Sequence, residues 1–468
     1  MGDNKKEQTI DYRFLARIII EAATPLAVHS GEKEVQTDAV VIRDVNGLPY
    51  IPGSSIAGVI RHAWKDAGND IDKLFGFQKN SKKTTEEDPN GMGSRIIVSE
   101  ARILNSQGMV VDGLMPETID QDPLLSNYSD LPIRQHVRIN HKGVAADNGK
   151  FDEQVVFQGT RFCFEMEMTG FKEEADTFSQ LLSILYQSTF RLGGGSRKGF
   201  GKIEVVEIKY DELKISDFYY LEKPANLEKS QKWYRQTLPA FKKVEGNMLC
   251  FKLRPENFFL FGSGFGDDDA DMTPVKEQKV SWKDGNGKLE DYEYLIPASS
   301  VKGALAHRTA FYYNKNDGFY AEGKTKAEIE AHTGSNNEAV RLLFGCEGDE
   351  KGEGKQRGNV ILSDMYIKTA QDKVLNHVAI DRFTGGAIDG ALFAEKTAYW
   401  HQANQEDYPL RLEILIDEKS IEKMDKNKVK EDALKAFNLA LNDLCNGLLP
   451  LGGGVNRGNG IFNGKKCE

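Results

Sequence analysis

Two short segments of similar sequence combine residue types that could bind an anion. The first, residues 51–61, reads IPGSSIAGVIR, and the second, residues 296–308, reads IPASSVKGALAHR. In each, a strand-like run ends in proline, two serines follow, and a helix is expected to begin. The unpaired N–H groups and the dipole of a helix N-terminus favour a negative charge. A serine here could also be a plain N-cap, so the duplication carries more weight than either segment alone.

A second pair of segments is rich in glycine and followed by basic residues. Residues 192–201 read LGGGSRKGFG and residues 451–460 read LGGGVNRGNG, each after an expected amphipathic helix. Consecutive glycines allow positive φ and a close approach of the backbone to a ligand. Arg197, Lys198 and Arg457 would add charge where a phosphate would lie. A helix C-cap is the alternative.

Basic residues also gather in two polar stretches that we expect to project from the fold as insertions. The first contains RQHVRINHK at 134–142, and the second contains HVAIDRF at 377–383. Basic and aromatic side chains together suit a single-stranded nucleic acid, through phosphate contacts and base stacking. The same charges could instead belong to a solvated hairpin.

The usual catalytic motifs are missing from the sequence: it has no P-loop, no nucleophile elbow and no HExxH. His29 and Asp38 flank one loop, where they could form an acid–base pair or bind a metal. An aspartate before a strand is also a common turn residue. The five cysteines are scattered without metal-ligand spacing, so we expect neither a disulfide framework nor a zinc site.

Composition describes a globular protein of about two to four domains. The 468 residues are 40% hydrophobic and 28% charged, with a net charge of −10. No apolar run approaches the roughly 20 residues that span a bilayer, and the polar start does not read as a signal peptide. We therefore expect a cytoplasmic protein without a membrane partner. The negative charge argues against nucleic acid, but acidic runs at 267–269 and 347–353 could lie away from a basic groove.

The matched segments belong to an internal repeat that covers most of the chain. Each half predicts a strand, a loop, a helix, a strand, an insertion, a strand, a helix, the glycine loop and a last strand. The offset between copies is 245 at Pro52 and 259 at Gly193, so loops differ in length. This order is typical of a ferredoxin-like fold. We predict an α+β protein with two tandem ferredoxin-like (RNA-recognition-like) domains at 1–210 and 246–468, and a linker at 211–245.

Taken as an ordered set, these motifs resemble those of the backbone subunits of type III CRISPR effector complexes, members of the RAMP superfamily. That family carries an IPGSSLKG-type motif, a Leu-Phe-Gly, a strand ending in an acidic residue, and a G-G-x-x-R-G-x-G loop. Both halves contain all four: IPGSSIAG, LFG, IIVSEA and GGGSRKGFG, then IPASSVKG, LFG, VILSDM and GGGVNRGNG. Two copies in one chain look like a fused double subunit, as in III-D-like systems.

The resemblance implies a subunit that binds a guide RNA and pairs it with target RNA, with a thumb-like hairpin inserted in each domain. The implied partners are guide RNA, target RNA and other effector subunits, including the large polymerase-like subunit. It implies the following RNA-binding residues: Ser54, Ser55, Arg61, Arg134, Arg138, Gly194, Arg197, Lys198, Ser299, Ser300, Lys302, Arg308, Arg382, Gly453 and Arg457.

The resemblance also implies chemistry in the first half. In catalytic members, an aspartate in a D-x-x-V-I-[KR]-D context cuts target RNA with a divalent metal. Residues 38–44 read DAVVIRD, which makes Asp38 the expected catalytic residue and Mg²⁺ or Mn²⁺ the expected cofactor. In the second half, counting back from Trp282 puts Gln278 at this place, and glutamine cannot act as a base. Upstream aspartates could substitute, so one or two active centres are expected: Asp267, Asp268, Asp269 and Asp271.

Two alternatives stay open at this point. The chain could be a structural backbone subunit without chemistry, which would share every motif except a working Asp38. It could also be a guide-processing endoribonuclease, a related RAMP class that also has a glycine-rich C-terminal loop, although the IPGSS motif fits that class poorly.

Overall fold

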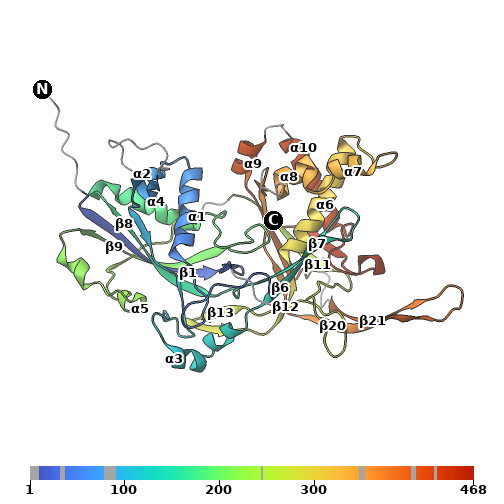
Figure 1. The fold of residues 1–468 in the computed structure, drawn as a ribbon, viewed down its shortest axis with the longest axis horizontal. Helices are drawn as coiled ribbons and strands as arrows, with labels where there is room; N and C mark the ends of the chain where they lie inside the picture. Colours follow the sequence, from blue (N-terminus) through green and yellow to red (C-terminus); the bar gives the residue numbers. More distant parts are fainter. Residues whose placement is uncertain are drawn as a thin grey trace.

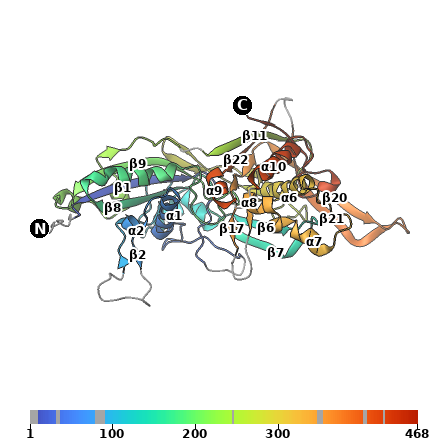
Figure 2. The same cartoon turned by 90° about the horizontal axis from the view of Figure 1, so that it is seen from above.

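The computed structural model describes residues 10–31, 37–78, 91–243, 246–346, 354–401, 407–425 and 429–467. They form two α+β domains that lie side by side along the long axis of the molecule (Figures 1 and 2). The acidic run predicted at 347–353 lies outside the described residues. No helix in these ranges is both long and apolar enough to cross a membrane.

The first domain is built on an antiparallel sheet with the order β9-β1-β8-β4, to which β5 and β10 add short edges. Two helices, α1 (Gly53–Asp66) and α4 (Ala175–Ser183), pack on one face of this sheet (Figure 1). The strands are β1 (Tyr12–Ala22), β4 (Ile96–Val98), β5 (Arg102–Ile103), β8 (Arg161–Gly170), β9 (Ile203–Lys214) and β10 (Gln236–Thr237).

Alternation along β1 explains this packing, because successive side chains of a strand point to opposite faces. Phe14, Ile18 and Ile20 are buried in the core with Ile56 of α1 and Phe178 of α4. Burying a side chain of this size contributes roughly 1.5–3 kcal/mol. The sheet and its two helices are therefore held together by one apolar layer.

The opposite face of the first sheet is also covered, by part of the segment predicted as a linker. Leu15 of β1 and Leu213 of β9 pack against Trp233 and Tyr234. Residues 218–237 therefore belong structurally to the first domain rather than to a free linker. The second domain begins with β11 (Asn247–Pro255).

The second domain repeats the arrangement. Its sheet has the order β23-β11-β22-β18, and the sheet of the first domain has the order β9-β1-β8-β4. In both, the last strand of the domain pairs with the first, followed by the third and the second. The elements are β11, β18 (Val360–Leu362), β22 (Leu410–Ile416) and β23 (Phe462–Lys466), with α6 (Ala298–Asn316) and α10 (Lys430–Cys445) in their common core. The prediction of an α+β chain with two tandem domains is confirmed.

Each domain carries a long hairpin where the sequence predicted an insertion. The first pairs β6 (Ile133–Ile139) with β7 (Ala145–Gln154), and the second pairs β20 (Ala370–Ile380) with β21 (Ala387–Trp400). The β6–β7 hairpin runs beside α6 of the second domain, whereas the β20–β21 hairpin projects beyond the molecule (Figures 1 and 2). We call them the inner thumb and the outer thumb.

A smaller hairpin of the second half docks on the first domain. It joins β13 (Val280–Lys283) to β14 (Asn286–Leu289). The N–H of Val280 donates to the carbonyl of Gln158 at 2.8 Å, and the Trp282 indole donates to that of Gly159 at 2.7 Å. A Cβ on Gly159 would lie 1.9 Å from the Val280 oxygen, so only glycine fits. This hairpin is an insertion in the second copy that joins the domains.

One expectation about cysteine is wrong, because Cys250 and Cys467 form a disulfide. The antiparallel register of β11 and β23 places residues 250 and 467 opposite each other, with their Cα atoms 5.2 Å apart. Their wide separation in the sequence hid this proximity.

The remaining short elements connect these parts. They are α2 (Asp72–Phe75), β2 (Phe77–Gln78), β3 (Gly91–Met92), α3 (Pro116–Gln121), α5 (Leu227–Ser230), β12 (Lys276–Glu277), β15 (Glu293–Ile296), α7 (Lys326–Ala331), α8 (Glu338–Phe344), β16 (Gly345–Cys346), β17 (Gln356–Arg357), β19 (Met365–Ile367) and α9 (Glu418–Met424).

Candidate functional site

Three cations meet where the two domains join. Arg197 and Lys198 come from the glycine loop of the first domain, and Lys302 comes from the first turns of α6. Burial, followed by the charges of Arg197 and Lys198, lowers the pKa of Lys302 to about 8. Burial, together with Arg357 and Arg191, lowers the pKa of Arg197 to about 10. A polyanion at this cluster would relieve the repulsion.

The paired serines are not helix caps. Pro52 and Pro297 occupy the N-cap positions of α1 and α6, and neither helix has a side-chain cap. Ser54, Ser55 and Ser300 are exposed, and Ser299 is half-buried. The plain N-cap interpretation is therefore wrong, and contact of these serines with RNA stays a prediction.

A protein carboxylate already occupies the start of α6. The N–H of Ala298 donates to Asp364 Oδ1 at 2.7 Å. Part of the anion-binding capacity of this helix end is therefore used within the fold, and the lysine one turn later becomes its main cation.

The backbone amides at the middle of the glycine loops are used by the fold. The Gly194 N–H donates to the carbonyl of Ala27, and the Gly453 N–H donates to that of Leu260, both at 2.7 Å. These two amides are therefore not free to bind a phosphate, and contact of Gly194 and Gly453 with RNA by other atoms stays a prediction. Gly195 has φ +63°, and a Cβ there would lie 2.4 Å from the Phe200 ring. The glycines shape the loop, and its basic side chains remain as the candidate anion ligands.

Arg134 does not face solvent, which corrects its prediction as an RNA contact. Its guanidinium, 3% exposed, donates from the inner thumb to Glu277 at 2.5 and 2.7 Å and to Asp364 at 2.7 Å in the second domain. Tyr366 also lies within hydrogen-bonding distance. Burial alone would lower the pKa of Arg134, but Asp364 and Glu277 raise it above its ordinary value. We call this group the arginine joint.

The other predicted basic residues fall into two groups. Arg308 lies 3.2 Å from Asp443 and also donates to the Leu448 carbonyl, and Arg457 pairs with Glu395. Arg61, Arg138 and Arg382 are exposed, so their contact with RNA stays a prediction.

Asp38 is exposed and held against the inner thumb. Its N–H donates to Asp152 Oδ1 at 2.8 Å, and the Asp152 N–H donates back to Asp38 Oδ2 at 3.3 Å. The following residue of the loop also contacts β7: the Gln154 N–H donates to the Ala39 carbonyl at 2.9 Å. These bonds fix the carboxylate of Asp38 at the surface of β7 while leaving it open to solvent.

A buried glutamate next to Asp152 connects this strand to the glycine loop. Glu153 lies 2.9 Å from His136 Nε2, 3.0 Å from Lys198 Nζ and 3.7 Å from His29 Nε2. Burial would raise the pKa of Glu153, but His136 and the charge of Lys198 lower it to about 2. Glu153 was not identified from the sequence. His29, which the sequence paired with Asp38 as a possible acid–base or metal group, and His136, which belonged to a basic stretch, both lie against this glutamate instead.

The second domain contains the same group. Glu395, fully buried, lies 3.0 Å from His377 Nε2 and pairs with Arg457 of the second glycine loop. His136 stacks on Phe151 with ring centroids 4.8 Å apart, and His377 stacks on Phe393 with centroids 4.9 Å apart. The alignment of His136 with His377 in the two copies was the sequence signal that could have revealed this group. The duplicated group links each thumb to its glycine loop.

Corresponding contacts with β21 identify the second-domain counterpart of Asp38 as Asp271, although its N–H donates to a backbone carbonyl rather than to a carboxylate. The Asp271 N–H donates to the Ala394 carbonyl at 2.9 Å, and the Ala394 N–H donates to Asp271 Oδ2 at 2.8 Å. The Lys396 N–H donates to the Met272 carbonyl, as that of Gln154 does to Ala39.

Gln278 is therefore not the counterpart of Asp38, which corrects the count back from Trp282. The offset is 233 at the bridged pairs His29–Val41 and Gly262–Pro274, and it is already 245 at Pro49, whose bridge to Arg43 matches the pairing of Tyr294 with Lys276. The β13–β14 hairpin lies in the interval where the offset changes, so a count that crosses it fails.

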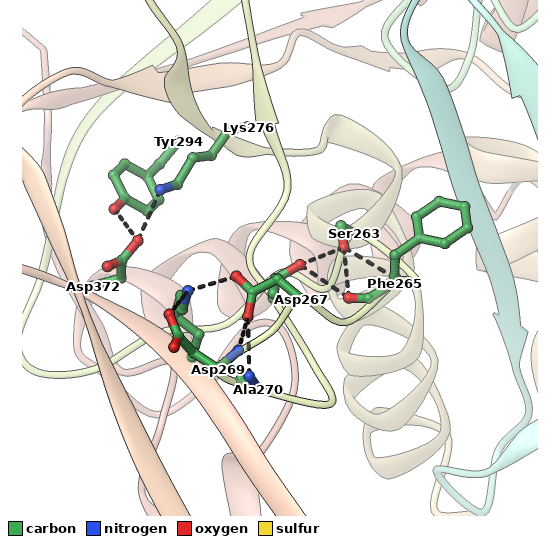
Figure 3. Close-up of polar contacts among 10 residues, drawn as sticks. Ser263, Phe265, Asp267, Asp269, Ala270, Lys276, Tyr294 and Asp372 are labelled. Carbon is green, nitrogen blue, oxygen red and sulfur yellow. Dashed lines mark hydrogen bonds and ion pairs between the residues drawn. The ribbon is translucent and has the colours of Figure 1, made fainter.

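Two of the other candidate aspartates, Asp267 and Asp269, lie close together in one turn (Figure 3). Lys396 Nζ lies 2.5 Å from Asp267 and 3.3 Å from Asp269. Asp267 also accepts the N–H groups of Asp269 and Ala270, both at 3.0 Å. The hydrogen bond with Lys396 is the main cause that lowers the pKa of Asp267. Asp268 is exposed. These residues close a turn, which leaves Asp271 as the candidate in this domain.

The donors near Asp38 fit a metal ion that is shared with a substrate. No group of three or more His, Cys, Asp or Glu in the described ranges could hold a metal. Asp38 and Asp152 supply two carboxylates, and Mg²⁺ commonly takes one or two carboxylates and completes its shell with water and phosphate. Ala394 replaces Asp152 in the second domain. The site in the first domain therefore offers a metal ion one more carboxylate than the site in the second domain.

Comparison with known proteins agrees with the internal repeat. The sequence model of the RAMP superfamily matches two regions, residues 19–204 and 282–463. A protein of Methanocaldococcus jannaschii named CRISPR system Cms endoribonuclease Csm3 is 28% identical over 230 residues. The alignment covers 43% of this chain and 82% of that protein.

Proposed function

The chain belongs to the RAMP superfamily, and we propose that it is a backbone subunit of a type III CRISPR ribonucleoprotein that binds guide RNA and cleaves the paired target RNA through Asp38. The observation that carries this proposal is the repeated arrangement of an aspartate held on the thumb strand, with a buried glutamate beside it that binds the basic glycine loop. The similarity to a protein named as an endoribonuclease supports the same activity.

The guide backbone would lie on the cation cluster. The cluster contains cations from both domains, so successive phosphates of one RNA strand could pass from the first domain to the second. These cations are Arg197, Lys198 and Lys302. Cation contacts to phosphates give affinity without sequence preference, as a protein that accepts many guides requires. The net charge of −10 does not oppose this, because the cations gather locally.

The chemistry of this chain would start at the exposed carboxylate of Asp38. Asp38 would accept the proton of a target 2′-hydroxyl, whose oxygen attacks the adjacent phosphorus and releases the 5′-oxygen of the next nucleotide. The Asp152 N–H orients the carboxylate, and a positioned base of this kind contributes roughly 10²–10⁴-fold. A divalent metal bound with the phosphate would offset the charge that develops on it.

Affinity for guide RNA is expected to fall as pH rises through the pKa of Lys302, which is about 8. Lys302 is charged below that pH, and a bound phosphate raises its pKa, so binding above it requires uptake of a proton. Fluorescence anisotropy with labelled RNA at constant ionic strength measures the profile. In Lys302→Arg the guanidinium stays charged, so its profile should be flatter. Identical profiles for the two proteins would contradict the assignment.

A second, slower cut in the target is expected to depend on Asp271. The change Asp271→Ala should lower the rate of this cut by at least about 100-fold. The cut is slower because Ala394 offers no carboxylate beside Asp271. Asp268→Ala, an exposed change in the same loop, serves as the matched control. Loss of the cut in the Asp268 variant with its retention in the Asp271 variant would reverse our assignment.

One alternative has an observation in its favour. The described residues contain no group of three or more His, Cys, Asp or Glu side chains that could hold a metal, which would suit a structural subunit without chemistry. Cleavage of a guide-matched target by the assembled complex separates the two: the structural alternative predicts that Asp38→Ala changes nothing.

A further inference from the structure

The arginine joint lets us compare the surfaces by which one domain receives the thumb of another. In the second domain the receiving surface consists of Glu277, Asp364 and Tyr366, which surround Arg134 of the inner thumb. Glu277 and Asp364 are almost fully buried by this contact. Because the domains are copies, the first domain has a surface at the same place, and the outer thumb has a position equivalent to Arg134.

Backbone pairing identifies the receiving surface of the first domain. The bridge of Arg43 to Pro49 matches that of Lys276 to Tyr294, so Asp44 is the counterpart of Glu277. In the same way, the bridge of Ile51 to Ala101 matches that of Ile296 to Met365. Asp364 and Tyr366 therefore correspond to Glu100 and Arg102.

This surface already contains its own arginine. Arg102 lies 3.2 Å from Asp44 Oδ2 and pairs with Glu100. The first domain thus supplies internally the cation that the second domain receives from a neighbour. An incoming arginine would find its carboxylates neutralised and would meet a like charge.

The outer thumb has lost the matching residue. The stacked pairs His136–Phe151 and His377–Phe393 align the two thumbs. On this alignment Leu375 stands where the inner thumb has Arg134. A leucine cannot pair with two carboxylates, and it would leave a buried acidic pair without a counterion.

We propose that the arginine joint is made once in each chain, and that Arg102 and Leu375 prevent it from forming between chains. A head-to-tail contact between identical units would otherwise add further chains, into a ring or an open filament. The two changes block it from both ends, since one removes the arginine and the other fills the site. We therefore expect that neither the outer thumb nor the receiving surface of the first domain binds a second copy of this chain. This inference does not depend on RNA binding or on Asp38.

The test restores the joint between chains. In the full-length double variant Arg102→Tyr/Leu375→Arg, both positions take the residue type of the working joint. We expect the wild-type chain without RNA to keep the mass of a monomer in light scattering across a concentration series. The double variant should increase in mass with concentration and pass beyond a dimer. Each single variant should remain a monomer, because each restores only one side.

Three results would overturn the proposal. One is a wild-type chain that grows with concentration as the double variant does. Another is a double variant that stays monomeric while its thermal unfolding matches that of the wild type. The last is growth that persists after Asp44→Ala and Glu100→Ala are added, because the restored joint needs both carboxylates. Both target positions are partly solvent-exposed, so the variants should fold.

Discussion

Asp38→Ala is expected to slow cleavage at one position of a guide-matched target RNA by at least about 100-fold. The carboxylate is the exposed group that β7 holds toward solvent, and alanine cannot accept a proton. RNA affinity should change little, because the cation cluster lies on other elements. The measurement is single-turnover cleavage of end-labelled target by the guide-loaded complex.

The control for this change is Asp130→Ala, which removes another exposed aspartate of the first domain. It should cleave at the wild-type rate. If the Asp38 variant loses target binding together with cleavage, Asp38 has a structural role. If it cleaves as fast as the Asp130 variant, Asp38 is not the base.

Arg134→Leu is expected to lower the free energy of unfolding by roughly 3–5 kcal/mol, as for other buried ion pairs that lose one partner. The change leaves Glu277 and Asp364 buried without their counterion. Urea unfolding followed by tryptophan fluorescence measures it, and Trp282, which bonds to the first domain across the same interface, is one of the reporters.

The pH dependence of this deficit has a definite sign. Burial raises the pKa of Asp364 even in the wild type, and loss of Arg134 removes the charge that opposes this. The carboxylates of the variant therefore become neutral more readily as pH falls, and the deficit should shrink toward acid. Arg382→Leu, at an exposed turn, is the control. A loss below about 1 kcal/mol, typical of an exposed pair, would contradict the joint.

Much of the fold could be predicted because it rests on local patterns that occur twice. The alternation in β1 and the apolar stripe of α1 gave the strand and helix order, and the order of matched segments gave the two domains. The repeat also located the thumbs, since polar stretches interrupt the same place in both halves.

The parts that sequence analysis missed depend on contacts between distant segments. Arg134 looked like one of several basic residues in a polar hairpin, and only the second domain shows that it is buried. The role of Gly194 also changed, since the Ala27 carbonyl that binds its N–H is remote in the sequence. Gln278 was misassigned because an insertion shifts the offset between copies before the serine motif.

The asymmetry between the domains therefore differs from the one that the sequence suggested. Both domains keep an aspartate held against a thumb strand, and the difference lies in the strand residue that it contacts, which is Asp152 in one and Ala394 in the other. We expect this neighbour to set the relative rates of two cuts rather than the presence of one.

The most direct test maps the cuts in one guide-matched target RNA for four proteins: the wild type, Asp38→Ala, Asp271→Ala and the double variant. Two cuts are expected in the wild type, with the faster one absent in Asp38→Ala, the slower one absent in Asp271→Ala, and neither present in the double variant. Cuts that persist at both positions in the double variant would contradict the assignment of the two aspartates.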